Sequence, residues 1–300
     1  MSTDRFALPS LEALLDHPPQ TVTRTGGAPL TYSRFGAPDG RRVMWLHGSP
    51  SCRLEGLVFH DWAVENGVSI VAFDRPGLGD APPRPGLTVR DIADDAVALA
   101  DALGWDRFHV FGGSAGGPYT LAVAAAIPQR LDAVVILASG GVDPANPAAS
   151  GWVDRAASVL SRRTPAILTA YFSMIQLGMR LPGPLITGVA RWIPSPDAAP
   201  LRHPRFVALF KAVNAAAFRQ GTAGAIEDYR RLGSDWGFSV GDIRAPVTVI
   251  QGTKDASVPI RQAQHYAKTI PDAALHLAPG DGHFAAIFNW QRVATILGWA

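Results

Sequence analysis

The chain has 300 residues, of which 47% are hydrophobic and 17% are charged, and its formal net charge is +2. This composition predicts a folded chain with a large apolar core and excludes long disordered tracts. The small net charge, without any block rich in lysine and arginine, argues against nucleic acid as a partner.

The first half of the chain predicts strands that begin to alternate with helices. Residues 1–19 are typical of a short amphipathic extension that ends at two prolines, and a hairpin follows over residues 21–25 and 30–35. Four short apolar runs then predict buried strands, at residues 42–46, 68–73, 107–111 and 133–138. Two helices are expected between them, at residues 89–103 and 115–127. This alternation indicates a mostly parallel sheet with helices on both faces.

Residues 143–238 interrupt this alternation and contain no strand pattern. They hold apolar stretches with helical spacing, separated by prolines, at residues 152–160, 166–181, 206–218 and 225–232. We predict an all-helical insertion here, a lid, that divides one α/β core into residues 1–142 and 239–300. The alternation resumes after it, with strands at 247–251 and 274–277 and helices at 260–270 and 284–299.

The most informative motif is Gly-x-Ser-x-Gly at residues 112–116, between a predicted strand and a predicted helix. In this context the motif is typical of a nucleophile elbow, a sharp turn that holds its serine in a strained backbone conformation. The turn would place Ser114 at a helix N-terminus, where unpaired N–H groups favour developing negative charge. A glycine-rich turn with a capping serine is the structural alternative. The context favours covalent chemistry at Ser114.

A serine hydroxyl needs a base, and the base needs a third group that fixes its tautomer. With an elbow serine the expected order along the chain is Ser, acid, His. His283 is the predicted base because it lies in a glycine-bounded loop between the last strand and the last helix. Asp255, just past the strand at 247–251, is the preferred acid, and Asp143 is the alternative.

Acyl transfer also needs backbone donors for the developing oxyanion. We expect one donor to be the N–H of Ala115, the residue after the nucleophile. The second should come from the loop at residues 46–50, where Pro50 has no N–H and Gly48 gives the backbone its freedom. The N–H of Ser49 is therefore the predicted second donor.

This set of motifs resembles the α/β-hydrolase fold family, in its serine-nucleophile branch. The matching segments are His47-Gly48-Ser49-Pro50, Asp74-Arg75-Pro76-Gly77-Leu78-Gly79, the elbow at Ser114, Asp255 before Val258-Pro259, and Gly282-His283. The resemblance implies a mainly parallel eight-stranded sheet, a lid inserted after the sixth strand, and a Ser–His–Asp triad. It covers most of the chain outside residues 143–238. One departure is Asp80, which stands where many relatives place a serine.

The resulting hypothesis is a serine hydrolase that cleaves a small or medium, mostly apolar ester, lactone or thioester. Amide hydrolysis, including removal of an N-terminal proline, is an alternative that requires an acidic lid group; Glu227, Asp228 and Asp235 are candidates. Hydrolysis of a C–C bond also shares the triad. A lyase, a cofactor-free oxygenase and a ligand receptor remain further alternatives. The predicted partner is a small-molecule substrate, and no cofactor, metal or oligomeric state is predicted.

Three features indicate a cytoplasmic protein. Cys52 is the only cysteine, which fits a reducing compartment. Residues 1–19 carry acidic residues and do not have the form of a secretory signal. No uninterrupted apolar stretch is long enough to predict a membrane span.

Overall fold

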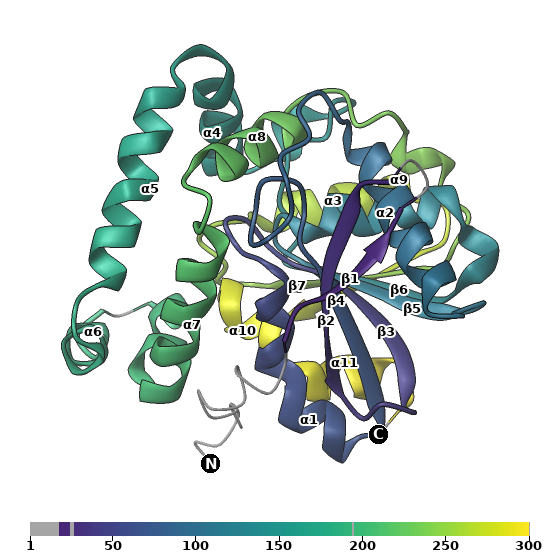
Figure 1. Ribbon diagram of the computed structural model, residues 1–300, viewed down its shortest axis with the longest axis horizontal. Coiled ribbons are helices and arrows are strands. Elements are labelled where there is room, and N and C mark those ends of the chain that lie inside the picture. The colour runs from purple at the N-terminus through teal and green to yellow at the C-terminus, as the bar shows by residue number, and fades with distance from the viewer. Residues whose placement is uncertain (1–17, 25–26, 194, 300) are drawn as a thin grey trace.

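The computed structural model describes residues 18–24, 27–193 and 195–299, so most of the predicted N-terminal extension lies outside the described residues (Figure 1). Eight strands form one sheet in the order β1-β2-β4-β3-β5-β6-β7-β8. The pairs from β4 through β3 to β8 are parallel, and β1–β2 and β2–β4 are antiparallel. The strands are β1 (Gln20–Thr23), β2 (Pro29–Gly36), β3 (Arg41–Leu46), β4 (Val68–Phe73), β5 (Phe108–Gly113), β6 (Leu131–Leu137), β7 (Val247–Gly252) and β8 (Ala273–Ala278). This confirms the predicted α/β class and its mostly parallel eight-stranded sheet.

Helices cover both faces of the sheet and bury its apolar side chains. One face packs against α2 (Val89–Ala102), α3 (Gly116–Ala126) and α9 (Ile260–Thr269). The other face packs against α1 (His60–Glu65) and α11 (Trp290–Ile296). Because β4 is buried at every position, it shows no alternation of polar and apolar residues, as expected for a central parallel strand.

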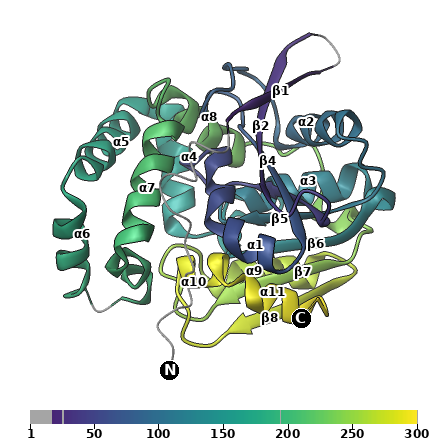
Figure 2. The same ribbon diagram turned by 60° about the horizontal axis from the view of Figure 1, so that its bottom comes forward.

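The chain between β6 and β7 contains helices and, among the described residues, no strand. Its α-helices are α4 (Trp152–Arg163), α5 (Pro165–Met179), α6 (Gly183–Ala190), α7 (Pro204–Ala217) and α8 (Ala223–Leu232). We call residues 152–232 the helical segment; α5, α6 and α7 lie beside the α/β core rather than over its sheet (Figures 1 and 2). A small apolar core includes Leu168, Phe172 and Phe218 of this segment together with Leu78 of the α/β core. Whether this segment acts as a lid and a separate domain stays a prediction.

Several helical elements differ from the prediction, and α1 is one that was not expected. The expected helix at 284–299 is two helices, α10 (His283–Phe288) and α11, because the side chain of Asn289 caps the second one by accepting a hydrogen bond from the Arg292 N–H. The helix α6 was not expected, since Gly183, Pro184 and Gly188 lower its intrinsic propensity. A 3₁₀ helix at Arg53–Phe59, which continues into α1, was also missed.

Candidate active site

The turn between β5 and α3 has the geometry of a nucleophile elbow. Ser114 adopts a left-handed backbone conformation with φ of +52°. Its N–H donates to the carbonyl of Leu137 at the end of β6, at 2.9 Å. A Cβ atom on Gly112 would lie 2.2 Å from the Thr120 hydroxyl, and one on Gly116 would lie 2.0 Å from the Leu46 carbonyl oxygen. The two glycines are therefore required by close approach, and the serine is the strained residue of the turn.

The predicted base and acid are hydrogen-bonded to each other. Nδ1 of His283, the first residue of α10, lies 2.8 Å from Oδ2 of Asp255, whose side chain is fully buried. The other oxygen of Asp255 accepts the N–H groups of Ser257 and Val258, at 2.8 Å each. Nε2 of Gln251, in β7, donates to Oδ2 of Asp255 at 3.0 Å. These contacts fix the carboxylate, which in turn favours the tautomer of His283 that leaves Nε2 free to accept a proton.

Two further carboxylates act on the imidazole of His283. Burial lowers its pKa, but the hydrogen bond and charge of Asp255, together with the charges of Asp197 and Asp154, outweigh burial and raise the pKa above its usual value. Asp197 accepts the backbone N–H of His283. Asp154, in α4, accepts the N–H of Gly141 at 3.0 Å. Burial raises the pKa of Asp154 to about 6, and neither of these carboxylates was a predicted site residue.

Ser114 and His283 line the same cavity, which has a volume of about 300 Å³. Among the described residues, no hydrogen bond joins the Ser114 hydroxyl to His283; such contacts often form only when substrate is bound. The alternative acid, Asp143, is not part of this arrangement, because its carboxylate pairs with the imidazole of His265 at 2.7 Å. The structure thus brings together Ser114, His283 and Asp255.

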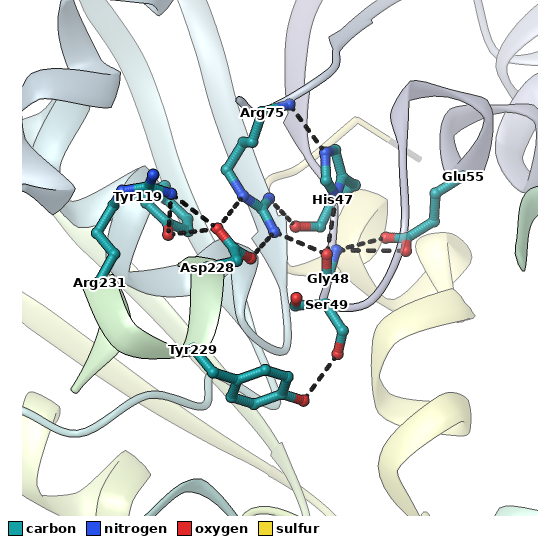
Figure 3. Close-up of polar contacts among 9 residues, drawn as sticks. All are labelled: His47, Gly48, Ser49, Glu55, Arg75, Tyr119, Asp228, Tyr229 and Arg231. Carbon is teal, nitrogen blue, oxygen red and sulfur yellow. Dashed lines mark hydrogen bonds and ion pairs between the residues drawn. The ribbon is translucent and has the colours of Figure 1, made fainter. Parts of the chain in front are cut away.

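The loop after β3 carries one of the two predicted oxyanion donors, the N–H of Ser49 (Figure 3). The Gly48 N–H donates to both carboxylate oxygens of Glu55, at 3.1 and 3.3 Å. The carbonyl of Ser49 accepts the hydroxyl of Tyr229, from α8, at 3.0 Å. The described residues provide no intramolecular acceptor for the N–H of Ser49 or of Ala115. Both predicted donors therefore remain available, whereas Gly48 is already engaged.

A buried arginine, Arg75, is hydrogen-bonded to the same loop (Figure 3). The guanidinium of Arg75 donates to the carbonyl of His47 and, at 2.8 Å, to the carbonyl of Gly48. It also pairs with Asp228 of α8, with Nε–Oδ1 and Nη2–Oδ2 distances of 3.1 and 2.7 Å. Arg231 adds a second cation at 3.1 Å from Asp228. Although burial raises the pKa of Asp228, these charges and hydrogen bonds hold it well below its usual range.

The three acids of the predicted lid that were candidates for binding a substrate amine have other partners in the structure. Asp228 faces Arg75 and Arg231, Glu227 pairs with Arg230, and Asp235 accepts the N–H of Gly237. None of the three acids belongs to the residues that line the cavity. Their side chains stabilise the protein or face its surface.

The cavity is mostly apolar, and its charged lining residues are acidic. Apolar side chains reach it from α5, α7 and α10, among them Ile175, Leu209 and Phe284. Glu55 and Asp154 also line it, and the described residues place no lysine or arginine there. Burial raises the pKa of Glu55, although hydrogen bonds oppose this shift. The charge of the described lining is therefore acidic, without a lysine or arginine to pair with an anionic group.

The described part of the chain holds neither a candidate metal cluster nor a membrane-spanning helix. No group of three or more histidine, cysteine, aspartate or glutamate side chains there could hold a metal ion. In the same ranges, no helix is both long and apolar enough to cross a membrane.

A strained serine at a strand-to-helix turn, with a hydrogen-bonded histidine and aspartate at the same edge of a mostly parallel sheet, is typical of the alpha/beta hydrolase fold. The alpha/beta hydrolase family model matches residues 40–296, and the chain belongs to this family of hydrolases. It is 27% identical over 300 residues to a proline iminopeptidase of Xylella fastidiosa, covering 89% of this chain and 90% of the relative.

Solved structures show the same fold. An enol-lactonase from Burkholderia xenovorans has a TM-score of 0.67 at 18% identity, with 93% of this chain and 99% of that chain covered. A hydrolase from Pseudomonas aeruginosa has a TM-score of 0.65 at 24% identity, covering 94% and 97% of the two chains.

Proposed function

We propose that this protein is a serine hydrolase of uncharged, mostly apolar carboxylic esters, lactones or thioesters. The observation that carries the proposal is the apolar cavity in which the strained Ser114 meets a histidine already bonded to a buried aspartate. The absence of lysine and arginine from its described lining supports a neutral substrate.

In the proposed reaction, the hydroxyl oxygen of Ser114 attacks the carbonyl carbon while Nε2 of His283 takes the hydroxyl proton. Asp255 holds the ring and stabilises the imidazolium that forms. The N–H groups of Ser49 and Ala115 donate to the oxyanion. The imidazolium then returns the proton to the departing alcohol or thiol, which leaves an acyl group on Ser114. A water molecule deprotonated by His283 releases the acid and restores the serine.

The test is labelling with a fluorophosphonate, followed by mass spectrometry of the modified peptide and an ester panel. We expect rapid labelling at Ser114, loss of labelling in His283→Ala, and loss of turnover in Ser114→Ala with the fold retained. Turnover that persists in Ser114→Ala would instead favour a lyase or oxygenase, in which the His–Asp pair is the base. Tight ligand binding without labelling or turnover would favour a receptor.

A second candidate is an aminopeptidase that removes an N-terminal proline, and one observation favours it. The carboxyl group of Asp154 lines the cavity close to the reaction centre and could bind a substrate amine, which is the acidic group that this activity requires. A relative with full-length similarity is named a proline iminopeptidase. The discriminating experiment compares proline p-nitroanilide with p-nitrophenyl esters: an aminopeptidase would turn over the anilide, and Asp154→Asn would abolish that activity while sparing neutral esters.

A further inference from the structure

The helix α5 is apolar on two opposite sides, and one of them is uncovered. Leu168 and Phe172 pack inward, into the core of the helical segment. On the other side an apolar stripe lies on the surface, with exposed fractions between 46% and 68%: Ile167, Tyr171, Met174, Leu177 and Leu181. The spacing of the first four places them on one face of the helix, and Leu181 follows just after its end. An all-round apolar helix is normally buried, so this face is expected to meet something.

The helix α6 and its C-terminal end continue the apolar surface. Leu185 and Val189 are about half exposed, and Trp192 has an exposed fraction of 89%. These three residues follow a spacing of four and then three positions, which again gives one helical face. Both views show α5 and α6 at the edge of the molecule that lies away from the sheet (Figures 1 and 2). We call the stripes on α5 and α6 the outer face.

The stretch of sequence that carries the outer face has charged residues of one sign, although Arg155 and Arg162 lie in α4 and Arg162 donates to the carbonyl of Gly233. Residues 155–196 contain five of the chain's 27 basic residues and none of its 25 acidic ones, so the rest of the chain carries a net negative charge. All five are exposed arginines, and no carboxylate of the described residues pairs with them. Arg163, the last residue of α4, stands four positions before Ile167 in the sequence, and Arg191 directly precedes Trp192. The five are Arg155, Arg162, Arg163, Arg180 and Arg191.

We propose that the outer face docks on an anionic lipid surface. Apolar side chains with an exposed tryptophan, next in sequence to Arg163, Arg180 and Arg191, which have no carboxylate partner among the described residues, match the acyl boundary and the negative headgroups of such a surface. A second copy of the chain fits less well, because a two-fold interface on this face would bring the arginines beside the stripes close to the same arginines of the other copy. The apolar stripes alone would fit either a lipid surface or a second copy of the chain, and the arginines favour the lipid surface.

Docking would bring lipid close to the cavity that holds Ser114. Tyr171 belongs to the outer face and also lines the cavity, while Ile175 lines it from the same helix. One helix therefore separates the outer face from the site. If the proposed function holds, esters with long acyl chains dissolved in the lipid are the substrate class, and they enter past α5.

The test uses the full chain with Ser114→Ala, so that vesicle binding is measured without hydrolysis. Flotation with phosphatidylcholine vesicles, with and without phosphatidylglycerol, should show binding at least ~10-fold stronger to the anionic vesicles and weakened by salt. Arg163→Gln and Arg191→Gln should each weaken binding about fivefold. Trp192→Ser should weaken it by at least ~10-fold. Val64→Ser, at a half-exposed site on α1, is the matched control and should bind like the parent.

Three results would overturn the docking proposal. They are equal binding to neutral and anionic vesicles, failure to bind either, and a dimer in light scattering that Trp192→Ser dissociates. Because the substituted side chains are exposed, thermal melts should show the parent fold in every variant. Turnover of a short water-soluble ester by the unmodified chain tests the proposed function separately. Turnover without vesicle binding would refute only the docking proposal. Vesicle binding without turnover or labelling would refute the proposed hydrolase function and, with it, the entry of lipid esters past α5.

Discussion

Replacing Asp228 by asparagine removes a carboxylate that faces two buried guanidinium groups. Arg75 lies 2.7 Å and Arg231 lies 3.1 Å from its oxygens, and all three side chains are completely buried. Asparagine keeps the shape of the side chain, but its amide N–H groups would face the N–H donors of the two guanidinium groups. The two cations would also lose the carboxylate charge that pairs with them. Arg231 already has one buried nitrogen without a partner among the described residues.

Breaking a buried ion pair by removing one partner costs about 3–5 kcal/mol. For a chain of 300 residues, that loss corresponds to a fall in Tm of about 5–8 °C. A second effect concerns catalysis, since the guanidinium of Arg75 also donates to the carbonyls of His47 and Gly48. If its orientation relaxes, the Ser49 N–H turns away from the oxyanion, and kcat should fall about tenfold or more with little change in KM.

The assay combines thermal unfolding with kcat and KM for a short ester, measured well below the Tm of each variant. Arg231→Met is the matched control, because Arg231 pairs with Asp228 but does not contact the loop after β3. It should lose stability and keep its kcat. A Tm of Asp228→Asn within about 2 °C of the parent would refute the energetic argument. Equal losses of kcat in both variants would show that the network does not position the loop.

Three further outcomes can be measured. Asp255→Asn should lower kcat by about 10⁴-fold, whereas Asp143→Asn should leave it within about twofold; similar losses in both would reverse the choice of acid. Asp154→Asn removes a charge that raises the pKa of the imidazole base, so the acid limb of the kcat/KM profile should move to lower pH, and an upward or absent shift would contradict the assignment. Gly116→Ala should cost at least ~3 kcal/mol in unfolding free energy because its Cβ would meet backbone, while Gly178→Ala, with open space around it, should cost nothing.

The sheet and the elbow could be predicted from the sequence because both are local. Buried strands are short apolar runs, and the sharp turn at Ser114 imposes its glycines within five residues. The pairing of Asp255 with His283 followed from the order of the loops along the sheet, since the carboxyl ends of parallel strands meet at one edge. The assignment of these three residues as catalytic still awaits the labelling experiment.

The contacts between the core and the helical segment could not be predicted in this way. Arg75 and Asp228 are 153 residues apart, and no spacing rule connects a loop after β4 to a helix in the segment. Asp228 was therefore assigned as a possible amine ligand, although in the structure it neutralises two arginines. Asp154 was missed for the same reason: its approach to the site depends on how α4 packs, which a single sequence does not specify.

The two proposals concern opposite sides of the helical segment. On the inner side, α8 is fixed to the loop after β3 by the Asp228–Arg75 pair and by the Tyr229–Ser49 hydrogen bond. Moving α8 would break a buried ion pair and disturb the loop that carries the proposed oxyanion donor Ser49, so we do not expect substrate entry to depend on the whole segment swinging open. The helix α5 carries no such polar link to the core loops among the described residues, and its contacts with the small core of the segment are apolar. A lipid surface against α5 would therefore contact the part of the segment that can move without breaking the polar contacts around the site.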